Sequence, residues 1–99
     1  MLTIIQNIDG AKALFKLQGR LDTVTSPELE TALRESLGGV SELTLDLEGL
    51  EYISSAGLRV LLEAQMNMVM REGMKLIHVG DTVREILEVT GFSEVLTIE

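Results

Sequence analysis

LDLEGLEYISSAGL, residues 45–58, is the stretch that decides the fold of this chain. The alternating residues from Leu43 to Leu47 predict a strand, and Gly49 to Ile53 read as its connection to the next element. The serine pair 54–55 then precedes a predicted helix from Ala56 to about Arg71. The apolar face of that helix consists of Leu58, Leu61, Leu62 and Val69. A strand that turns directly into a helix is typical of α/β proteins.

Further elements are predicted on both sides of this stretch. The N-terminal half begins with a predicted hairpin, which consists of a strand over 2–9, a turn at Asp9-Gly10 and a strand over 11–18. A loop over 19–23 leads to a predicted helix. This helix starts with a Ser or Thr cap at Thr25-Ser26-Pro27 and ends at Gly38-Gly39. The C-terminal half has a third central strand over 74–79, a helix from Gly80 to about Thr90, and a short segment from Phe92 to Ile98 that can add a last strand. We expect one α/β domain over residues 1–99 with element order ββαβαβα, an optional final β, and a mixed, mostly parallel β-sheet with helices.

Composition narrows the functional classes. Hydrophobic residues make up 45% and aromatic residues only 3%, so the core must be aliphatic. The absence of cysteine excludes disulfides and cysteine-based metal sites. The net charge of −8 argues against nucleic acid and anionic membranes as partners. The chain shows neither a signal peptide at Met1–Ile5 nor an apolar run that could span a bilayer, so we expect a soluble, cytoplasmic protein.

The turn at Ser54 and Ser55 is the strongest candidate site. It lies between a strand and a helix, where open α/β sheets usually carry their sites. One interpretation is structural, with one serine capping the helix and the other a turn residue, and caps are common. The other is functional: a phosphate there would meet free N–H groups at the helix start and bring about −1.5 to −2 units of charge. Gly57 would leave the first turn bare, so that another backbone could approach closely.

Other chemistry has little support in the sequence. Ser55 lacks the Gly-x-Ser-x-Gly pattern of a nucleophile elbow, and the only histidine, His78, lies on a different strand. A lone histidine does not make a transition-metal site, and Asp46, Glu48 and Glu51 fit a solvated loop better than a cation site. Gly38-Gly39 matches no nucleotide-binding loop. We therefore expect no enzyme activity, no cofactor and no metal.

Methionines concentrate in one stretch, at positions 66, 68, 70 and 74. Flexible methionine side chains commonly fill gaps in a core, and this is the simpler interpretation. The alternative is an adaptable contact surface for another protein.

The chain resembles the STAS domain family over essentially its full length, and within it the small stand-alone anti-sigma factor antagonists. Three stretches carry the resemblance: Leu17–Asp22, Leu45–Leu58 and Val83–Phe92. The resemblance implies that the unmodified protein binds an anti-sigma factor that is also a serine kinase, and so frees a sigma factor for transcription. The kinase then phosphorylates a serine of the turn with ATP, the complex separates, and a serine phosphatase restores the first state.

The family pattern implies roles for particular residues. By position Ser55 is the phosphate acceptor, with Ser54 as second choice, and the partner-binding patch consists of Asp22, Thr23, Ser54, Ser55, Gly57 and Leu58. Many members carry Asp immediately before the acceptor, where this chain has Ser54, so two adjacent hydroxyls compete. We also expect a monomer when the protein is free, an expectation that the sequence leaves open to test. The alternative function is that of a STAS accessory or structural subunit of a larger assembly, such as a lipid transporter or another signalling complex, without phosphorylation.

Overall fold

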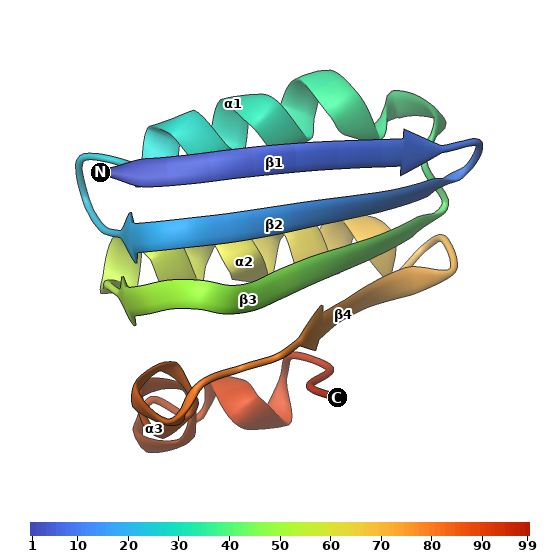
Figure 1. Cartoon of the computed structure of the whole chain (residues 1–99). Coiled ribbons are helices and arrows are strands. Elements are labelled where there is room, and N and C mark those ends of the chain that lie inside the picture. The colour runs from blue at the N-terminus through green and yellow to red at the C-terminus, as the bar shows by residue number, and fades with distance from the viewer.

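A computed structural model describes all residues of the chain, 1–99 (Figure 1). Four strands and three helices follow one another in the predicted order. They are β1 (Leu2–Asp9), β2 (Lys12–Leu21), α1 (Ser26–Ser36), β3 (Glu42–Ile53), α2 (Ser55–Met68), β4 (Gly73–Ile77) and α3 (Asp81–Val89). Two short 3₁₀ turns, Leu37–Gly39 and Phe92–Glu94, follow α1 and α3. No helix has both the length and the apolar character needed to cross a membrane.

The strands form one mixed sheet in the order β1-β2-β3-β4. β1 and β2 are the antiparallel hairpin, and β2, β3 and β4 run parallel to one another, so the predicted fold class is confirmed. Two details of the prediction are wrong. β4 is an edge strand rather than a central one, because β3 is its only partner strand. The optional last strand is reduced to a single bridge between Leu76 and Ile98, since the preceding residues form a 3₁₀ turn instead.

Strands β2 and β3 are longer than predicted. The residues over 19–21 and 49–53, which read as loops, pair with each other and extend both strands as far as Leu21 opposite Ile53. The register shifts on the way, so the extension is irregular and its apolar alternation is broken. Gly19 adopts a φ of +101°, and a Cβ there would lie 2.3 Å from the carbonyl oxygen of Met1. The glycine thus permits a close backbone approach that hid this part of the strand from a pattern-based prediction.

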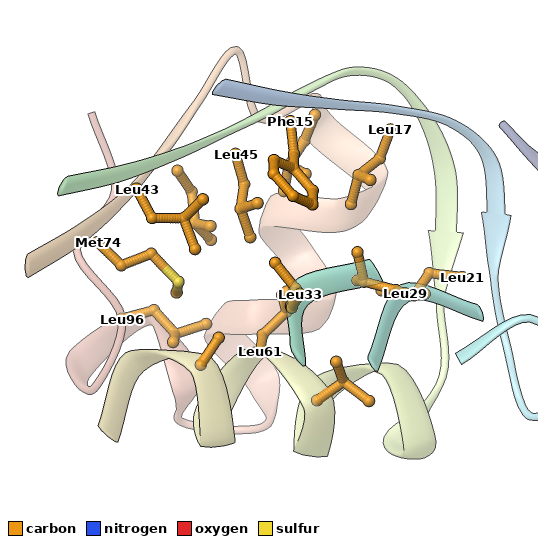
Figure 2. Packing of buried hydrophobic residues seen from close by; sticks show 14 of the residues in the cluster. Phe15, Leu17, Leu21, Leu29, Leu33, Leu43, Leu45, Leu61, Met74 and Leu96 are labelled. Atoms are coloured by element: carbon orange, nitrogen blue, oxygen red, sulfur yellow. The ribbon is translucent and has the colours of Figure 1, made fainter. Parts of the chain in front are cut away.

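The core lies between the sheet and the helices α1 and α2, and α3 adds Val83 and Leu87 to the same buried cluster (Figures 1 and 2). Alternate residues of β2 point into it, and Phe15 and Leu17 are fully buried. On β3, Leu43 and Leu45 continue the same layer, because they lie opposite Ala13 and Phe15 of β2. The core is aliphatic except for Phe15, as the composition predicted.

The apolar face of α2 differs from the predicted one. Val69 lies beyond the end of the helix and is 63% exposed. The buried residues of α2 are instead Gly57, Leu58, Val60, Leu61, Ala64 and Met68. Of the four methionines, Met68 and Met74 fill the core, whereas Met66 and Met70 are exposed. The core-filling interpretation is therefore confirmed for Met68 and Met74, and the contact surface for another protein stays a prediction for the other two.

Candidate functional site

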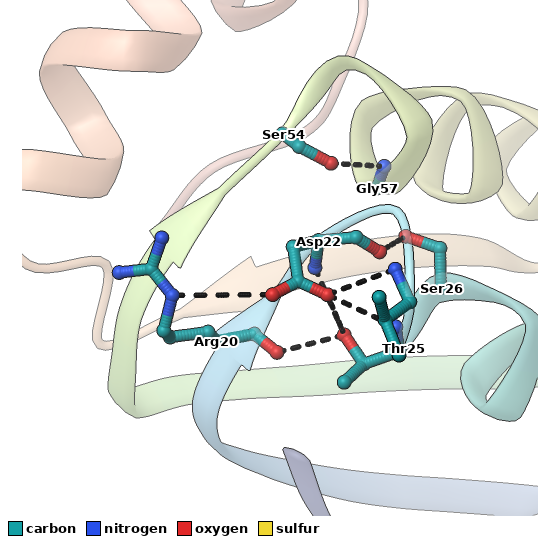
Figure 3. A network of polar contacts seen from close by, with 7 residues as sticks. Arg20, Asp22, Thr25, Ser26, Ser54 and Gly57 are labelled. Carbon is teal, nitrogen blue, oxygen red and sulfur yellow. Dashed lines mark hydrogen bonds and ion pairs between the residues drawn. The ribbon is translucent and has the colours of Figure 1, made fainter. Parts of the chain in front are cut away.

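Two loops meet at the end of the sheet where β2 and β3 finish. The N–H of Ser54 donates a hydrogen bond of 2.9 Å to the carbonyl oxygen of Leu21, which ties the end of β3 to the end of β2. The carboxyl ends of parallel neighbours share one edge of a sheet, so the loops that follow them are adjacent. Here these loops are residues 22–25 and the turn into α2 at Ser54-Ser55 (Figure 3). Asp22 and the serine pair, 32 positions apart in the printed sequence, are thereby brought together.

The loop after β2 is held by the Asp22 side chain. Its Oδ1 accepts hydrogen bonds of 3.0 Å from the N–H groups of both Val24 and Thr25. The Oγ1 of Thr25 accepts a bond of 2.9 Å from the N–H of Asp22. Its single proton is shared between two acceptors, the carbonyl oxygen of Arg20 at 2.8 Å and Oδ1 of Asp22 at 3.1 Å. The hydroxyl of Ser26 donates to the carbonyl oxygen of Asp22. A short loop with this many internal bonds is a preformed surface rather than a flexible one.

This network corrects the predicted start of α1. Thr25 stands at the N-cap position, but its backbone is already helical, with φ −91° and ψ −20°, and its hydroxyl makes no cap bond. Ser26 is the first helical residue, and its hydroxyl turns back to the loop. The hydroxyls of both residues are used to stabilise the β2–α1 loop, because Asp22 offers them nearer partners than the helix does.

Asp22 is ionised at neutral pH. The hydrogen bond from the Thr25 N–H, helped by those from the Thr25 hydroxyl and the Val24 N–H, holds the pKa of Asp22 below its usual value against a smaller opposing effect of burial. The Nε of Arg20 lies 3.9 Å from the other carboxylate oxygen, and its guanidinium stacks 4.4 Å from the centre of the Tyr52 ring. The loop therefore presents a fixed negative charge with one cation beside it.

The two serines differ in their surroundings. Ser54 is the N-cap of α2, with an extended backbone, and its Oγ accepts a hydrogen bond of 3.3 Å from the N–H of Gly57. Ser55 is the first residue of the helix and is exposed, and its hydroxyl makes no hydrogen bond within the chain. The structural role expected for one of the two serines thus falls to Ser54. The hydroxyl of Ser55 is left accessible at the positive end of α2.

Gly57 and Leu58 lie below this surface. Both are buried, and a Cβ on Gly57 would lie 2.8 Å from Cγ of Leu21 and 2.9 Å from Cγ1 of Ile53. The space that the glycine leaves free is therefore filled by the protein's own core, and the prediction that it admits a foreign backbone is wrong. Gly57 instead lets the first turn of α2 pack closely on β2 and β3. Among the predicted patch residues, Thr23 and Ser55 are exposed, and Asp22 and Ser54 are half-buried.

Sequence reasoning missed four residues around the site: Arg20, Val24, Thr25 and Tyr52. The spacing of Asp22 and Thr25 is a signal for a hydrogen-bonded loop that was available. The stacked pair of Arg20 and Tyr52 had no sequence signal, because it depends on the register of β2 with β3. Val24, which is 81% exposed, adds an apolar side chain to the loop.

A separate polar pair joins β3 to the end of β4. Nδ1 of His78 lies 3.0 Å from Oδ1 of Asp46, and the same carboxylate oxygen accepts a bond of 3.0 Å from the Glu48 N–H. Burial alone would raise the pKa of Asp46, but the bonds from Glu48 and His78 outweigh it and lower that pKa overall. Asp46 is thus a buried structural residue and not part of an acidic loop. Two hollows of the surface, of about 310 and 380 Å³, are lined by none of the predicted patch residues.

Comparison with known proteins points to one family. The family model described as "Mlab, STAS domain" matches residues 4–97. BtrV of Bordetella bronchiseptica, named as a candidate anti-sigma factor antagonist, is 35% identical over 101 residues, which cover 99% of this chain and 85% of BtrV.

Solved structures share the fold. An anti-sigma factor antagonist from Mycobacterium paratuberculosis superposes with a TM-score of 0.88 at 22% identity, over 99% of this chain and 85% of the other. The Bacillus cell fate determinant SpoIIAA in its phosphorylated form superposes with a TM-score of 0.75 at 16% identity, over 98% of this chain and 91% of the other. At these identities the structural likeness establishes the fold alone.

Proposed function

The chain belongs to the STAS domain family of anti-sigma factor antagonists, and we propose that it works by phosphorylation-controlled partner exchange. In this proposal the unmodified protein binds an anti-sigma factor that is also a serine kinase, and a sigma factor is released. Phosphorylation of Ser55 ends the complex, and a serine phosphatase reverses the modification. The protein itself is a binding module without an enzymatic step, and its proposed location is the cytoplasm, where sigma factors act.

One observation carries this proposal: the contrast between the two serine hydroxyls. That of Ser54 is occupied as a helix cap, whereas that of Ser55 is exposed and has no partner. A kinase needs an accessible hydroxyl that can be turned towards its nucleotide without dismantling a structural bond. Ser55 meets this condition at no cost to the helix, which favours it over Ser54 as the acceptor.

The charges around Ser55 explain how a phosphate would act. The first turn of α2 offers unpaired N–H groups and the positive end of the helix dipole, so the folded protein tolerates the added anion. The neighbouring loop presents the Asp22 carboxylate, whose lowered pKa keeps it negative. A phosphate would bring about −1.5 to −2 further charges to the same surface. A partner fitted to Asp22, Thr23 and a neutral Ser55 hydroxyl would then lose contact through bulk, desolvation and repulsion.

Paired variants test the electrostatic switch. Ser55→Asp is expected to weaken binding to a purified anti-sigma factor kinase, and Ser55→Ala to bind it without being released by ATP. The matched control is Ser54→Asp, which adds the same charge one residue away and keeps a good helix cap. Binding is measured by isothermal titration calorimetry. Equal affinities of Ser55→Asp and Ser54→Asp for the kinase would contradict the proposal.

A constitutive subunit is the second candidate. One observation favours it: the cap formed by Ser54 gives one of the two serines a purely structural role. Mass mapping of the protein isolated from its own cells, with and without phosphatase treatment, distinguishes the two functions. Phosphate on Ser55 supports partner exchange, whereas an unmodified turn with a co-purified partner under several growth conditions supports the subunit.

A further inference from the structure

The two edges of the sheet are finished in different ways. On β4, the N–H of Leu76 donates 2.8 Å to the carbonyl oxygen of Thr97, and the N–H of Glu99 donates 2.9 Å to the carbonyl oxygen of Leu76. The C-terminal segment thus covers part of that edge. β1 has only β2 as a partner and is the outermost strand at the other end of the sheet (Figure 1). An uncovered edge presents unpaired N–H and C=O groups to any strand that can align with it.

The register identifies which groups of β1 point outward. Met1 lies opposite Arg20, and the N–H of Arg20 donates 3.1 Å to the carbonyl oxygen of Met1, so this is a hydrogen-bonded pair. In an antiparallel ladder such pairs alternate with pairs that do not bond to each other. The odd-numbered residues of β1 therefore bond to β2. The even-numbered ones, Leu2, Ile4, Gln6 and Ile8, turn their N–H and C=O groups to the open edge.

The side chains of β1 do nothing to block this edge. Natural edge strands are usually protected by lysine, proline, a bulge or an inward-pointing charge. β1 contains none of these, and its register with β2 is continuous. Its only charged residue is Asp9, at the far end. Ile5 and Ile8 are 45% and 46% exposed, so the strand also leaves apolar surface in contact with water.

We propose that β1 is the pairing surface for a second copy of this chain, with the two β1 strands antiparallel in one continuous sheet. Several registers pair the outward-bonding, even-numbered residues with one another, and the proposed one pairs Ile4 with Gln6 and Leu2 with Ile8 of the other copy, because it sets the exposed Ile5 against its own counterpart. The two-fold axis then passes at Ile5, which faces its own counterpart in a non-bonded position, where side chains approach most closely. This register sets Ile5 against Ile5 and Ile8 against Leu2 of the other copy, and it places no charged side chain opposite another along the shared strands.

A second copy fits this edge better than a segment of another protein does. In the proposed register each outward-bonding residue of β1 meets an outward-bonding residue of the other copy, and Ile5 meets Ile5. The pairing buries a small area and works against the repulsion between two chains of net charge −8, so it gives a transient dimer rather than a permanent one. It differs from the free monomer that we expected from the sequence. It is also independent of the proposed function, since antiparallel pairing leaves the two Asp22–Ser55 surfaces at opposite ends of the dimer.

The test is the mass of the unmodified chain as a function of concentration, measured by sedimentation equilibrium. At low salt the repulsion between the chains is strongest, so the measurement is made in about 0.15 M salt, where it is screened beyond about 8 Å. The weight-average mass is expected to rise from 10.9 kDa towards twice that value between about 10 µM and 1 mM, a range suited to small transient interfaces.

Ile5→Glu is the decisive variant. Within one chain the new carboxylate faces Lys16 on β2, an opposite-charge pair that supports folding. In the dimer it faces a second carboxylate across the axis, and at least a tenfold loss of association is expected. Val89→Glu is the matched control, because Val89 is 77% exposed on α3 and the substitution adds the same charge. Gln6→Pro is a second variant, which deletes one outward N–H without adding a charge.

Amide hydrogen exchange read by NMR gives a residue-specific check. In dilute solution the amides of Ile4 and Gln6 are expected to exchange faster than those of Thr3 and Ile5, and to slow as the concentration rises. The proposal is supported if wild type and Val89→Glu dimerise and both β1 variants do not. A wild-type chain that stays monomeric at 1 mM, or a dimer that survives Ile5→Glu and Gln6→Pro, overturns it. Slowed exchange only on adding an extended peptide would show that the edge takes a different occupant.

Discussion

Replacing Gly57 by alanine is expected to destabilise the protein, although alanine is the better helix former. The new Cβ would lie 2.8 Å from Cγ of Leu21, 2.9 Å from Cγ1 of Ile53 and 3.0 Å from Cδ2 of Leu21. Carbon atoms pack best at about 3.5–4.0 Å, so the contacts are too short by more than half an ångström. Neither neighbour can move away easily, because both side chains are fully buried. Overpacking of this kind costs about 1–3 kcal/mol.

The gain from helix propensity does not offset this cost. Alanine is favoured over glycine by about 1 kcal/mol in a helix interior. Gly57 is only the third residue of α2, where the propensity is expressed in part. The net loss of unfolding free energy is therefore about 1–2 kcal/mol, which lowers Tm by about 5–15 °C in a domain of this size.

The assay is urea and thermal unfolding followed by circular dichroism, with Gly38→Ala as the matched control. A Cβ on Gly38 would meet no atom within 4 Å, so this variant is expected to be neutral or slightly more stable. If Gly57→Ala were as stable as Gly38→Ala, the close packing of α2 on Leu21 and Ile53 would be wrong. The placement of the serine turn relative to β2 would then have to be revised as well.

Three further predictions concern the site itself. Ser54→Ala is expected to cost about 0.5–2 kcal/mol in urea unfolding, because it removes the helix cap, whereas Ser55→Ala stays within about 0.5 kcal/mol of wild type; equal losses would contradict the assignment of the cap. Thr25→Val leaves the Asp22 N–H without its acceptor and is expected to cost about 1–3 kcal/mol by the same measurement, while an unchanged midpoint would show that the loop does not depend on this hydroxyl. The lowered pKa of Asp22 stabilises the folded state at pH values above its ordinary value of 3.8, and this stability is lost as the pH falls through the lower pKa of the folded state. Acid titration of Asp22→Asn should therefore show a shallower loss of stability below pH 4, and a slope as steep as that of wild type would refute the shift.

Much of the fold could be predicted because it depends on local patterns. The turn at Asp9-Gly10, the alternation along β2 and the helical spacing in α2 are each set by a few neighbouring residues. All three elements form, although β2 extends to Leu21 and α2 ends at Met68 instead of near Arg71. The errors occur where distant residues decide. The residues over 49–53 look like a loop, yet they form a strand because those over 19–21 lie beside them. Val69 continues the helical spacing of the apolar residues, but α2 ends at Met68, and the side chain of Val69 is exposed to solvent.

The site, like the fold, could be predicted from the sequence only in part. The serine pair is visible in the sequence, because a strand followed by two hydroxyl residues and a helix is a local signature. Which hydroxyl serves as the cap is a matter of geometry, decided by the bond from Gly57 to Ser54. The role of Gly57 was misjudged for a similar reason. From the sequence, the missing side chain of a glycine suggests free space beside the backbone. Only the positions of Leu21 and Ile53 in the structure show that the space beside Gly57 is already filled.

The sequence by itself determined the order of the elements, the aliphatic character of the core and the serine turn at the start of α2, since each follows from residues close together in the chain. The tertiary structure alone decided that the Asp22 loop and that turn form one surface. The parallel pairing of β2 with β3, which ends in the bond from the Ser54 N–H to the Leu21 carbonyl oxygen, brings these two segments together although they are far apart in sequence. It also decided which strand is left at an open edge. Pairing between strands depends on the whole sheet, so no local pattern contains it.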